Sequence, residues 1–338
     1  MAREATPRFN RRPATILAGR DPVRCAVWAG ALVLVSLEVA LRSESIWRAA
    51  GGTAMPFLTL AAIIAAAAFA ERLGAFALLA RMMIPATSPT AASVAAVLVF
   101  TAMLSGLVNL DVAVVVAMPM ALMVAARRSV SAGWLAGAVA VTANATSFLL
   151  PTSNVTTLLV LSASGSRRSY VGDSWVAWIF VTTLTVGVLS LVVSRRVGEG
   201  TPRATGDGPR LGAVLDLVPM FLAASAIRGL LSSGLVLHGP LIEQVTLGSA
   251  FGAVTNNLPA AAALHVTGAN GLWAAVLAMS IGPNLLITGS VATLICRRIA
   301  RDGGATLSAR SFSAMGVALV PVQLVAGFIG LHLTGALH

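Results

Sequence analysis

The chain has 338 residues, of which 57% are hydrophobic and only 10% are charged; a soluble domain carries roughly a quarter charged residues, so the composition excludes a soluble globular protein. Several long apolar runs also exclude a single membrane anchor. The net charge of +11 comes entirely from arginine, and because the arginines cluster in short loops between apolar runs, they follow the positive-inside rule and argue against a nucleic-acid partner.

The apolar runs divide the chain into two halves joined by one linker rich in Gly, Pro and Arg. Residues 1–23 are arginine-rich and are predicted to form a disordered basic cytoplasmic tail. The first half, residues 24–194, is predicted to contain spans at 24–41, 54–80 and 175–194, a hairpin at 91–126 and a broken helix at 134–164. A cytoplasmic linker is expected at 195–212. The second half, residues 213–332, is predicted to contain spans at 213–233 and 311–332, a hairpin at 241–267 and a broken helix at 272–299.

The apolar run at 91–126 is too long for one crossing, which needs about twenty residues. Small and polar residues interrupt it between Ser105 and Asp111, and arginines flank both of its ends. We therefore predict a re-entrant hairpin with its tip near Asn109–Asp111. The alternative is two ordinary spans, each of about seventeen residues and at the lower limit for crossing.

Two further runs carry polar residues and proline near their middles. The first is interrupted at Pro151–Asn154 and the second at Gly282–Ser290. Irregular backbone at membrane depth is tolerated only where it is buried in protein or lines a cavity. Both runs are therefore predicted to be broken transmembrane helices whose interruptions form a binding site.

The two halves contain the same pair of predicted features, a hairpin followed by a broken helix. The segment 152–159 matches 288–295, and 106–111 matches 252–257, each pair lying at a helix interruption. Counting crossings from a cytoplasmic tail places 17 of the 23 arginines inside and brings the hairpins in from opposite faces. The predicted fold class is an all-α polytopic membrane protein, an inverted-topology repeat with two re-entrant hairpins and two broken transmembrane helices.

Three residues are assigned to the periphery from their positions in the runs. Glu38 lies near a span end and is expected at the interface, as is Trp178 on the first helix after the broken one. Cys296 is expected near an inner face, far from Cys25, so the sequence indicates neither a disulfide framework nor a thiolate metal site. No HExxH motif or Ser/His/Asp grouping is present, and we predict that the protein is not an enzyme.

The interruptions resemble motifs of the ion transporter superfamily, most closely those of ArsB-type arsenite efflux permeases, which are related to NhaD antiporters and divalent-anion/sodium symporters. The similar segments are Asp111 with Pro119, Pro151–Asn154, Thr255–Pro259 and Gly282–Leu294. The chain departs from the family pattern at Leu110, where the family has asparagine, and at Asn284, where it has lysine. The resemblance implies a small inorganic or anionic substrate and allows a homodimer and a cytoplasmic ATPase partner.

Asp111 is the one acid at the centre of an apolar run, and an intramembrane carboxylate is by default a functional hypothesis. We predict a proton or sodium site at this end of the first half, formed by Asp111, Asn109, Ser153 and Asn154. The second half is predicted mainly to bind substrate, through Asn256, Asn257, Asn284, Thr288 and Ser290, with Thr152 and Thr156 from the first half. The simpler interpretation is that these amides and hydroxyls only cap half-helices.

The predicted function is secondary active transport in the cell membrane, with a cytoplasmic N-terminus and no cofactor beyond the coupling ion. Arsenite or antimonite efflux in exchange for protons is the first hypothesis. A sodium/proton antiporter or a sodium-coupled carboxylate transporter of the same superfamily is the alternative, and a channel or membrane sensor is less favoured. The Asn109–Asp111 tip is expected to meet Pro151–Asn154, and Asn256–Asn257 to meet Thr288–Ser290.

Overall fold

A computed structural model describes residues 22–42, 58, 62, 69, 73, 78, 88–164, 169–198, 217–230 and 235–337. The predicted tail at 1–23 and the predicted span at 54–80 lie almost wholly outside the described residues. The same holds for most of the linker at 195–212 and for the first residues of the span predicted at 213–233.

The described residues form an all-α membrane protein. Four helices are long and apolar enough to cross a bilayer: α4 (Thr90–Leu107), α5 (Leu110–Arg128), α8 (Tyr170–Ser194) and α15 (Ala309–Leu333). The sequence predicted α8 and α15 as spans at 175–194 and 311–332, and both extend beyond the predicted bounds. Their mixture of apolar residues on every face is typical of helices whose surroundings are apolar throughout.

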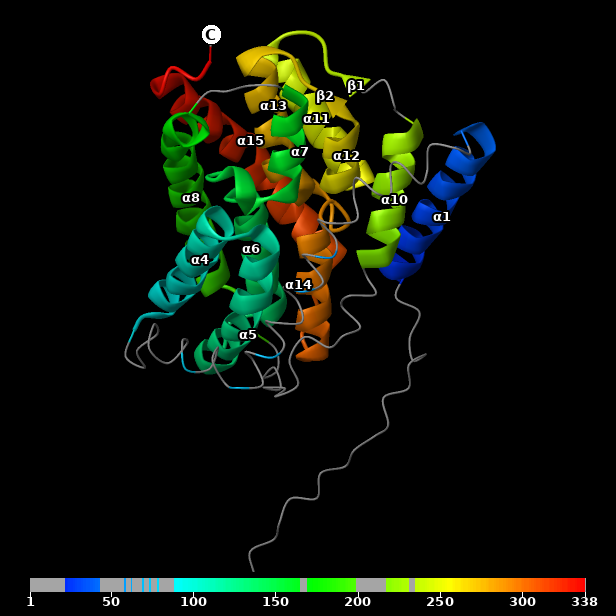
Figure 1. Cartoon of the computed structure of the whole chain (residues 1–338). Coiled ribbons are helices and arrows are strands. Elements are labelled where there is room, and N and C mark those ends of the chain that lie inside the picture. The colour runs from blue at the N-terminus through cyan, green and yellow to red at the C-terminus, as the bar shows by residue number, and fades with distance from the viewer. Residues whose placement is uncertain are drawn as a thin grey trace, which may run out of the picture.

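Shorter elements complete the fold (Figure 1). The helices are α1 (Pro22–Arg42), α6 (Ala132–Ala145), α7 (Val155–Ser164), α10 (Leu217–Leu230), α11 (Leu241–Thr255), α12 (Asn257–Ala263), α13 (Gly268–Ile281) and α14 (Val291–Asp302). Two 3-10 turns, η1 (Pro151–Ser153) and η2 (Gly282–Leu285), each carry a proline within their first two positions. Proline lacks an N–H, so it can begin such a turn but cannot continue the preceding helix.

Each segment predicted as a re-entrant hairpin contains two helices joined by a short turn, and α4 and α5 are each long enough for the alternative of two ordinary spans. In the first, α4 and α5 are joined by Val108 and Asn109, close to the predicted tip. In the second, α11 and α12 are joined by Asn256 alone, and α12 is only 7 residues long. The predicted hairpin extends to residue 267, but the helix stops at Ala263. There Leu264–His265 (β2) pairs in parallel with Leu235–Val236 (β1).

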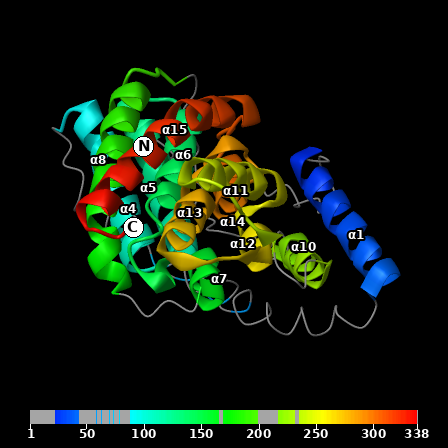
Figure 2. The same ribbon diagram turned by 90° about the horizontal axis from the view of Figure 1, so that it is seen from above.

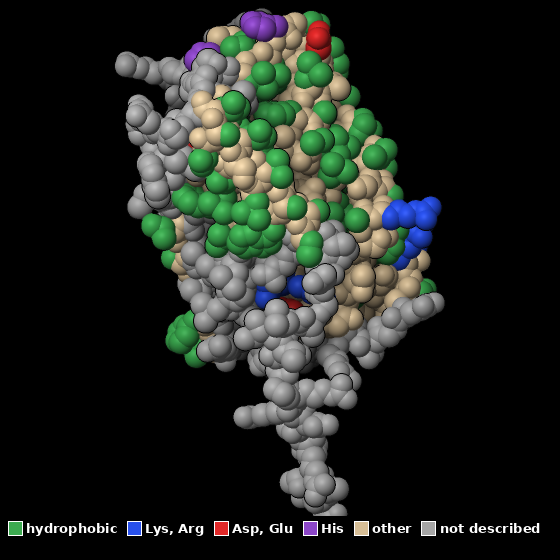
Figure 3. All heavy atoms as spheres, turned by 90° about the vertical axis from the view of Figure 1, so that its right-hand side faces the viewer, with side chains coloured by type: hydrophobic (Ala, Val, Ile, Leu, Met, Phe, Trp, Pro, Cys, Tyr) green, Lys and Arg blue, Asp and Glu red, His purple; other side chains and the backbone are tan. Residues whose placement is uncertain are grey.

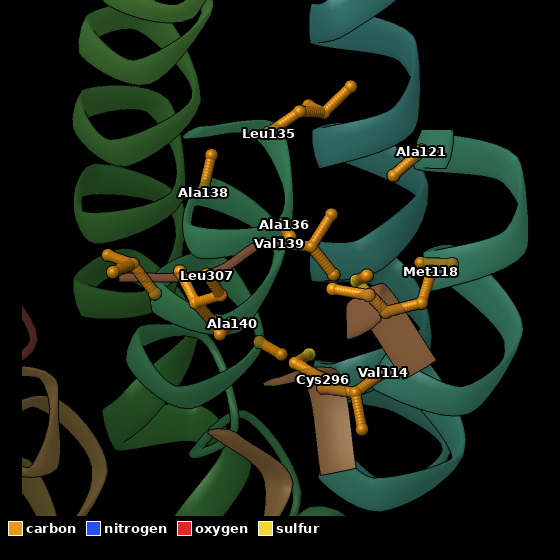
Figure 4. Packing of buried hydrophobic residues seen from close by; sticks show 14 of the residues in the cluster. Val114, Met118, Ala121, Leu135, Ala136, Ala138, Val139, Ala140, Cys296 and Leu307 are labelled. Atoms are coloured by element: carbon orange, nitrogen blue, oxygen red, sulfur yellow. The ribbon is translucent and has the colours of Figure 1, made fainter. Parts of the chain in front are cut away.

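The second arm of each hairpin packs against the broken helix of the other half. Helix α5 lies beside α14, and α12 lies beside α7. Figure 1 shows the first pair in the lower part of the molecule and the second pair in the upper part. Figure 4 shows how α14 enters the core of the first half: Cys296 lies close to Val114 of α5 and Ala140 of α6.

Helices α8 and α15 pack along one side, whereas α1 and α10 form a pair at the opposite edge (Figure 2). Gln323 Nε2 of α15 donates to Thr185 Oγ1 of α8 over 2.8 Å. Glu38, expected near the interface, lies in the last part of α1 with its side chain 0% exposed. Ala31, seven residues earlier on the same helical face, is also buried, and α10 is the neighbour of α1.

Candidate functional site

Three backbone carbonyls of the first gap, residues 146–154 between α6 and α7, accept hydrogen bonds from side chains of α8. Trp178 Nε1 donates to Thr146 O over 2.8 Å, and Tyr170 OH donates to Phe148 O over 2.8 Å. Ser174 Oγ donates to Leu149 O over 3.0 Å. Backbone carbonyls without partners are costly in an apolar medium. The side chains of one long helix therefore stabilise this break.

The predicted residues Ser153 and Asn154 close the first gap from within. Ser153 Oγ donates to Ser147 O over 2.8 Å, and Asn154 Nδ2 donates to Ser147 Oγ over 2.9 Å. Asn154 Oδ1 accepts from Thr156 N over 3.0 Å, so Asn154 caps the start of α7. Thr152 is exposed, whereas the Thr156 hydroxyl is buried and has no hydrogen-bond partner among the described residues.

The second gap, residues 282–290 between α13 and α14, is bonded by a hairpin tip. Asn256 Nδ2 donates to Thr288 O over 2.9 Å, and Asn257 N donates to Gly289 O over 2.8 Å. Asn257 Nδ2 also donates to Met279 O over 3.3 Å. The expected meeting of Asn256–Asn257 with Thr288–Ser290 is confirmed. The hairpin tip therefore supplies the donors, and the backbone carbonyls of the second gap accept them.

A fully buried cluster links the two broken helices through Asn144. Asn144 Nδ2 donates to Asn284 Oδ1 over 2.9 Å and to Thr293 Oγ1 over 3.0 Å, and Asn144 Oδ1 accepts from Ser290 Oγ over 2.8 Å. Ser290 Oγ also accepts from Thr293 N and so caps α14. The predicted substrate ligands Asn284 and Ser290 are therefore bonded to the first half, and each is 0% exposed.

Asp111 lies in the first turn of α5, where Asn109 Oδ1 accepts from its backbone N–H over 2.8 Å. Its side chain is 8% exposed, and its carboxylate accepts no hydrogen bond from the described residues. Cys296, expected near an inner face, is 0% exposed and belongs to the same buried apolar cluster as Leu110 and Val114 of α5. A buried carboxylate without a partner is costly unless a proton or a cation compensates it.

The first hairpin approaches the first gap without bonding to it at the expected residues. The end of α4 lies near η1, but among the described residues no hydrogen bond joins Asn109–Asp111 to Pro151–Asn154. Instead, Ser105 Oγ donates to Ala143 O. A Cβ at Gly106 would lie 2.6 Å from Trp178 Nε1. The first hairpin is therefore fixed through α4, one turn before its tip.

The two hairpin tips have the same kind of cap. Asn109 Oδ1 accepts from the N–H two residues later, and Asn256 Oδ1 does the same from Leu258 N over 3.3 Å. With these two caps superposed, Leu258 and not Asn257 stands opposite Asp111. The sequence match through Gly106 and Gly252 pairs Asp111 with Asn257, because Gly106 precedes Asn109 by three residues whereas Gly252 precedes Asn256 by four.

Sequence reasoning missed several residues that hold the gaps. Trp178 was placed at the membrane interface, yet it lies between Gly106 and the first gap. Asn144 stands at the start of the first interruption, but nothing in its sequence context identifies its partners Asn284 and Ser290. Tyr170 and Ser174 lie in the turn that begins α8, where hydroxyls are common.

Comparison with known proteins identifies no relative of this chain. The chain matches no protein-family model, and no curated protein is similar to it at a significant level.

Proposed function

We propose that the protein is a secondary active transporter built as an inverted repeat, with re-entrant hairpins α4–α5 and α11–α12 and broken helices α6–α7 and α13–α14. Each half has the same order of hairpin, broken helix and long span. Asn154 and Ser290, which the repeat aligns, both cap the second segment of a broken helix. The pairing of α5 with α14 and of α7 with α12 supports a pseudo-twofold relation.

The distribution of charge supports a cytoplasmic lower end. Arginines lie at the end of α5, directly after α8 and in the last turns of α14: Arg127 and Arg128, Arg195 and Arg196, and Arg297, Arg298 and Arg301. Figure 3 shows arginine side chains in the lower half of one face and histidine side chains at its upper end. Under the positive-inside rule, the arginine end faces the cytoplasm. We accordingly place the protein as a multi-pass protein in the cell membrane, with its N-terminus inside.

The proposed coupling of transport to protons rests on the environment of Asp111. Its carboxylate is buried, accepts no hydrogen bond from the described residues and stands in the first turn of α5. The positive end of the helix favours the ionised form, whereas the apolar surroundings favour the protonated form. A group balanced in this way can take up and release a proton as the site changes its exposure. We therefore assign proton exchange to Asp111.

We propose arsenite as the transported substrate, with antimonite as a close analogue. The motif resemblance supports this choice, and so does the chemistry of the gaps, which offer amides, hydroxyls and backbone carbonyls. The neutral acid As(OH)₃ can donate hydrogen bonds from its hydroxyls to such carbonyls and accept them from amides. Cys296 stands alone, so recognition by a cage of thiolates is not part of the proposal.

A flux assay in proteoliposomes tests this function. Arsenite movement driven by an imposed pH gradient is expected for the natural sequence and is expected to fall to the level of protein-free liposomes in Asp111→Asn, which keeps the size of the side chain. Asp173→Asn, in the first turn of α8, is the matched control and should retain flux. Sodium-dependent movement of a dicarboxylate, with no arsenite flux, would instead identify the alternative carboxylate transporter.

A further inference from the structure

The tip of the second hairpin is held in a conformation that L residues rarely adopt. Asn256 has φ 76° and ψ 141°, a region that favours glycine. Both polar atoms of its side chain form hydrogen bonds: Oδ1 accepts from Leu258 N, and Nδ2 donates to Thr288 O. A strained residue persists only where its surroundings over-determine it. These bonds therefore hold the tip closed against the second gap.

The bonds across the gap occupy two specific acceptors, the carbonyl oxygens of Thr288 and Gly289. Asn256 Nδ2 reaches the first, and Asn257 N reaches the second. Within the described part of the chain, no other donor bonds either oxygen. Because bare carbonyls are costly at membrane depth, withdrawal of the tip requires replacement donors from water or from a ligand.

The packing of the hairpin allows such a withdrawal. Helix α11 meets α13 and η2 through small residues: a Cβ added at Gly252 or Gly248 would touch Met279 or Ala278. The Ser249 hydroxyl is buried here and has no described hydrogen-bond partner. Among the described residues, no side-chain hydrogen bond joins α11 to α13 or η2 at this contact, so withdrawal of the tip would break none there. Where the structure describes the chain, the hydrogen bonds between the tip and the gap come from Asn256 and Asn257.

We propose that the α11–α12 tip is a latch that competes with substrate for the carbonyl oxygens of Thr288 and Gly289. When the tip withdraws, these two oxygens accept hydrogen bonds from the hydroxyl groups of a small uncharged oxyacid. The amides of Asn256 and Asn257 occupy the same acceptors in the closed state. This inference rests on the proposed transport of arsenite for the identity of its ligand. The latch itself depends only on the contacts of the hairpin.

Hydrogen exchange on the full chain in lipid nanodiscs tests the latch. Asn256→Gly relaxes the backbone and removes both side-chain bonds, so amide exchange should quicken about fivefold, the factor for one net hydrogen bond, in 256–258 and also in 286–290. Asn109→Gly is the matched control, because it removes an equivalent cap that makes no bond to a gap. Its effect should stay within 109–113. Unchanged exchange at 286–290 in Asn256→Gly, or equal changes across both gaps, would overturn the latch.

Sodium arsenite tests the competition with substrate. Added to the natural sequence, it should quicken exchange at the Asn257 amide, although bound ligands usually slow exchange. In the flux assay, Asn256→Gly should lower the apparent KM several-fold without a matching rise in maximal rate, because less of the protein is held in the closed state.

The outcomes separate the two proposals. Arsenite flux with slowed or unchanged exchange at Asn257 would overturn the competition while the transporter stands. Absence of arsenite flux would overturn the proposed function and the ligand assigned here. The comparison of Asn256→Gly with Asn109→Gly would still decide whether the tip is a latch.

Discussion

The two gaps share a sequence pattern but are stabilised by different neighbours. Trp178, Tyr170 and Ser174 of α8 donate to the carbonyls of the first gap. The corresponding span of the second half, α15, presents Gly316 to the backbone of η2, and the hairpin tip supplies the donors through Asn256 and Asn257. Helix α8 also packs against α15, so it supports the first gap from a fixed position. The second gap is supported by the tip at Asn256, which can withdraw.

The comparison teaches that two broken helices of one protein need not be supported in the same way. Every carbonyl freed by a helix break needs a donor, and the choice of donor decides which part can move. The first gap is tied to a 25-residue helix. The second depends on a tip that can withdraw. The acid at Asp111 and the latch at Asn256 therefore lie in different halves, each beside a broken helix.

The largest expected effect comes from adding one methyl group at Gly316. A Cβ there would overlap the carbonyl oxygen of Asn284, a backbone atom that cannot turn away. Gly316→Ala should therefore destabilise the fold by about 3 kcal/mol or more. Thermal unfolding in detergent micelles measures this as a lower midpoint.

Gly187→Ala provides the control for that substitution. Gly187 lies within α8, and a Cβ there meets nothing within 4 Å. Alanine is favoured over glycine in a helix by about 0.5–1 kcal/mol, so this variant should unfold at the same or a higher temperature. Equal losses in both variants would show that α15 does not support the second gap through this contact.

The next effect tests the link between the gaps. Asn144→Ala removes three side-chain hydrogen bonds and leaves Asn284 and Ser290 without a partner they use. The expected loss is about 2–4 kcal/mol, measured by the same thermal unfolding. Thr142→Val is the control, since the buried Thr142 hydroxyl has no hydrogen-bond partner among the described residues. A loss of similar size in the control would contradict the special role of Asn144.

The breaks themselves could be predicted from the sequence because their causes are local. Pro151 and Pro283 lie at the start of 3-10 turns, where a missing N–H is tolerated. Asn109, Asn154 and Ser290 are residues that cap a helix. The same local logic predicted the turn at Asn109, which separates α4 from α5. It also identified Asp111, since an acid inside an apolar run is conspicuous without any knowledge of its neighbours.

The neighbours of the breaks could not be predicted, because in a membrane both lipid and protein are apolar. The pattern of α8 does not reveal which face meets protein, so Trp178 was taken for an interfacial anchor. The pairing of α5 with α14 is likewise a tertiary property that no local motif encodes. The sequence match of Asp111 with Asn257 differs by one residue from the pairing of the two asparagine caps, because a short motif does not show how many residues precede the cap.

The smallest expected effect on stability distinguishes most clearly between the two gaps. Trp178→Phe removes the hydrogen bond to Thr146 O while keeping an aromatic ring against Gly106. The expected loss is about 1 kcal/mol. Hydrogen exchange should quicken in 146–154 and stay unchanged in 282–290, because α8 supports only the first gap. Trp175→Phe is the control, since Trp175 is 50% exposed and lies one turn away on the same helix. Faster exchange at 282–290 in Trp178→Phe would show that the two gaps are stabilised as a single unit, and the distinction between a fixed and a removable support would then fail.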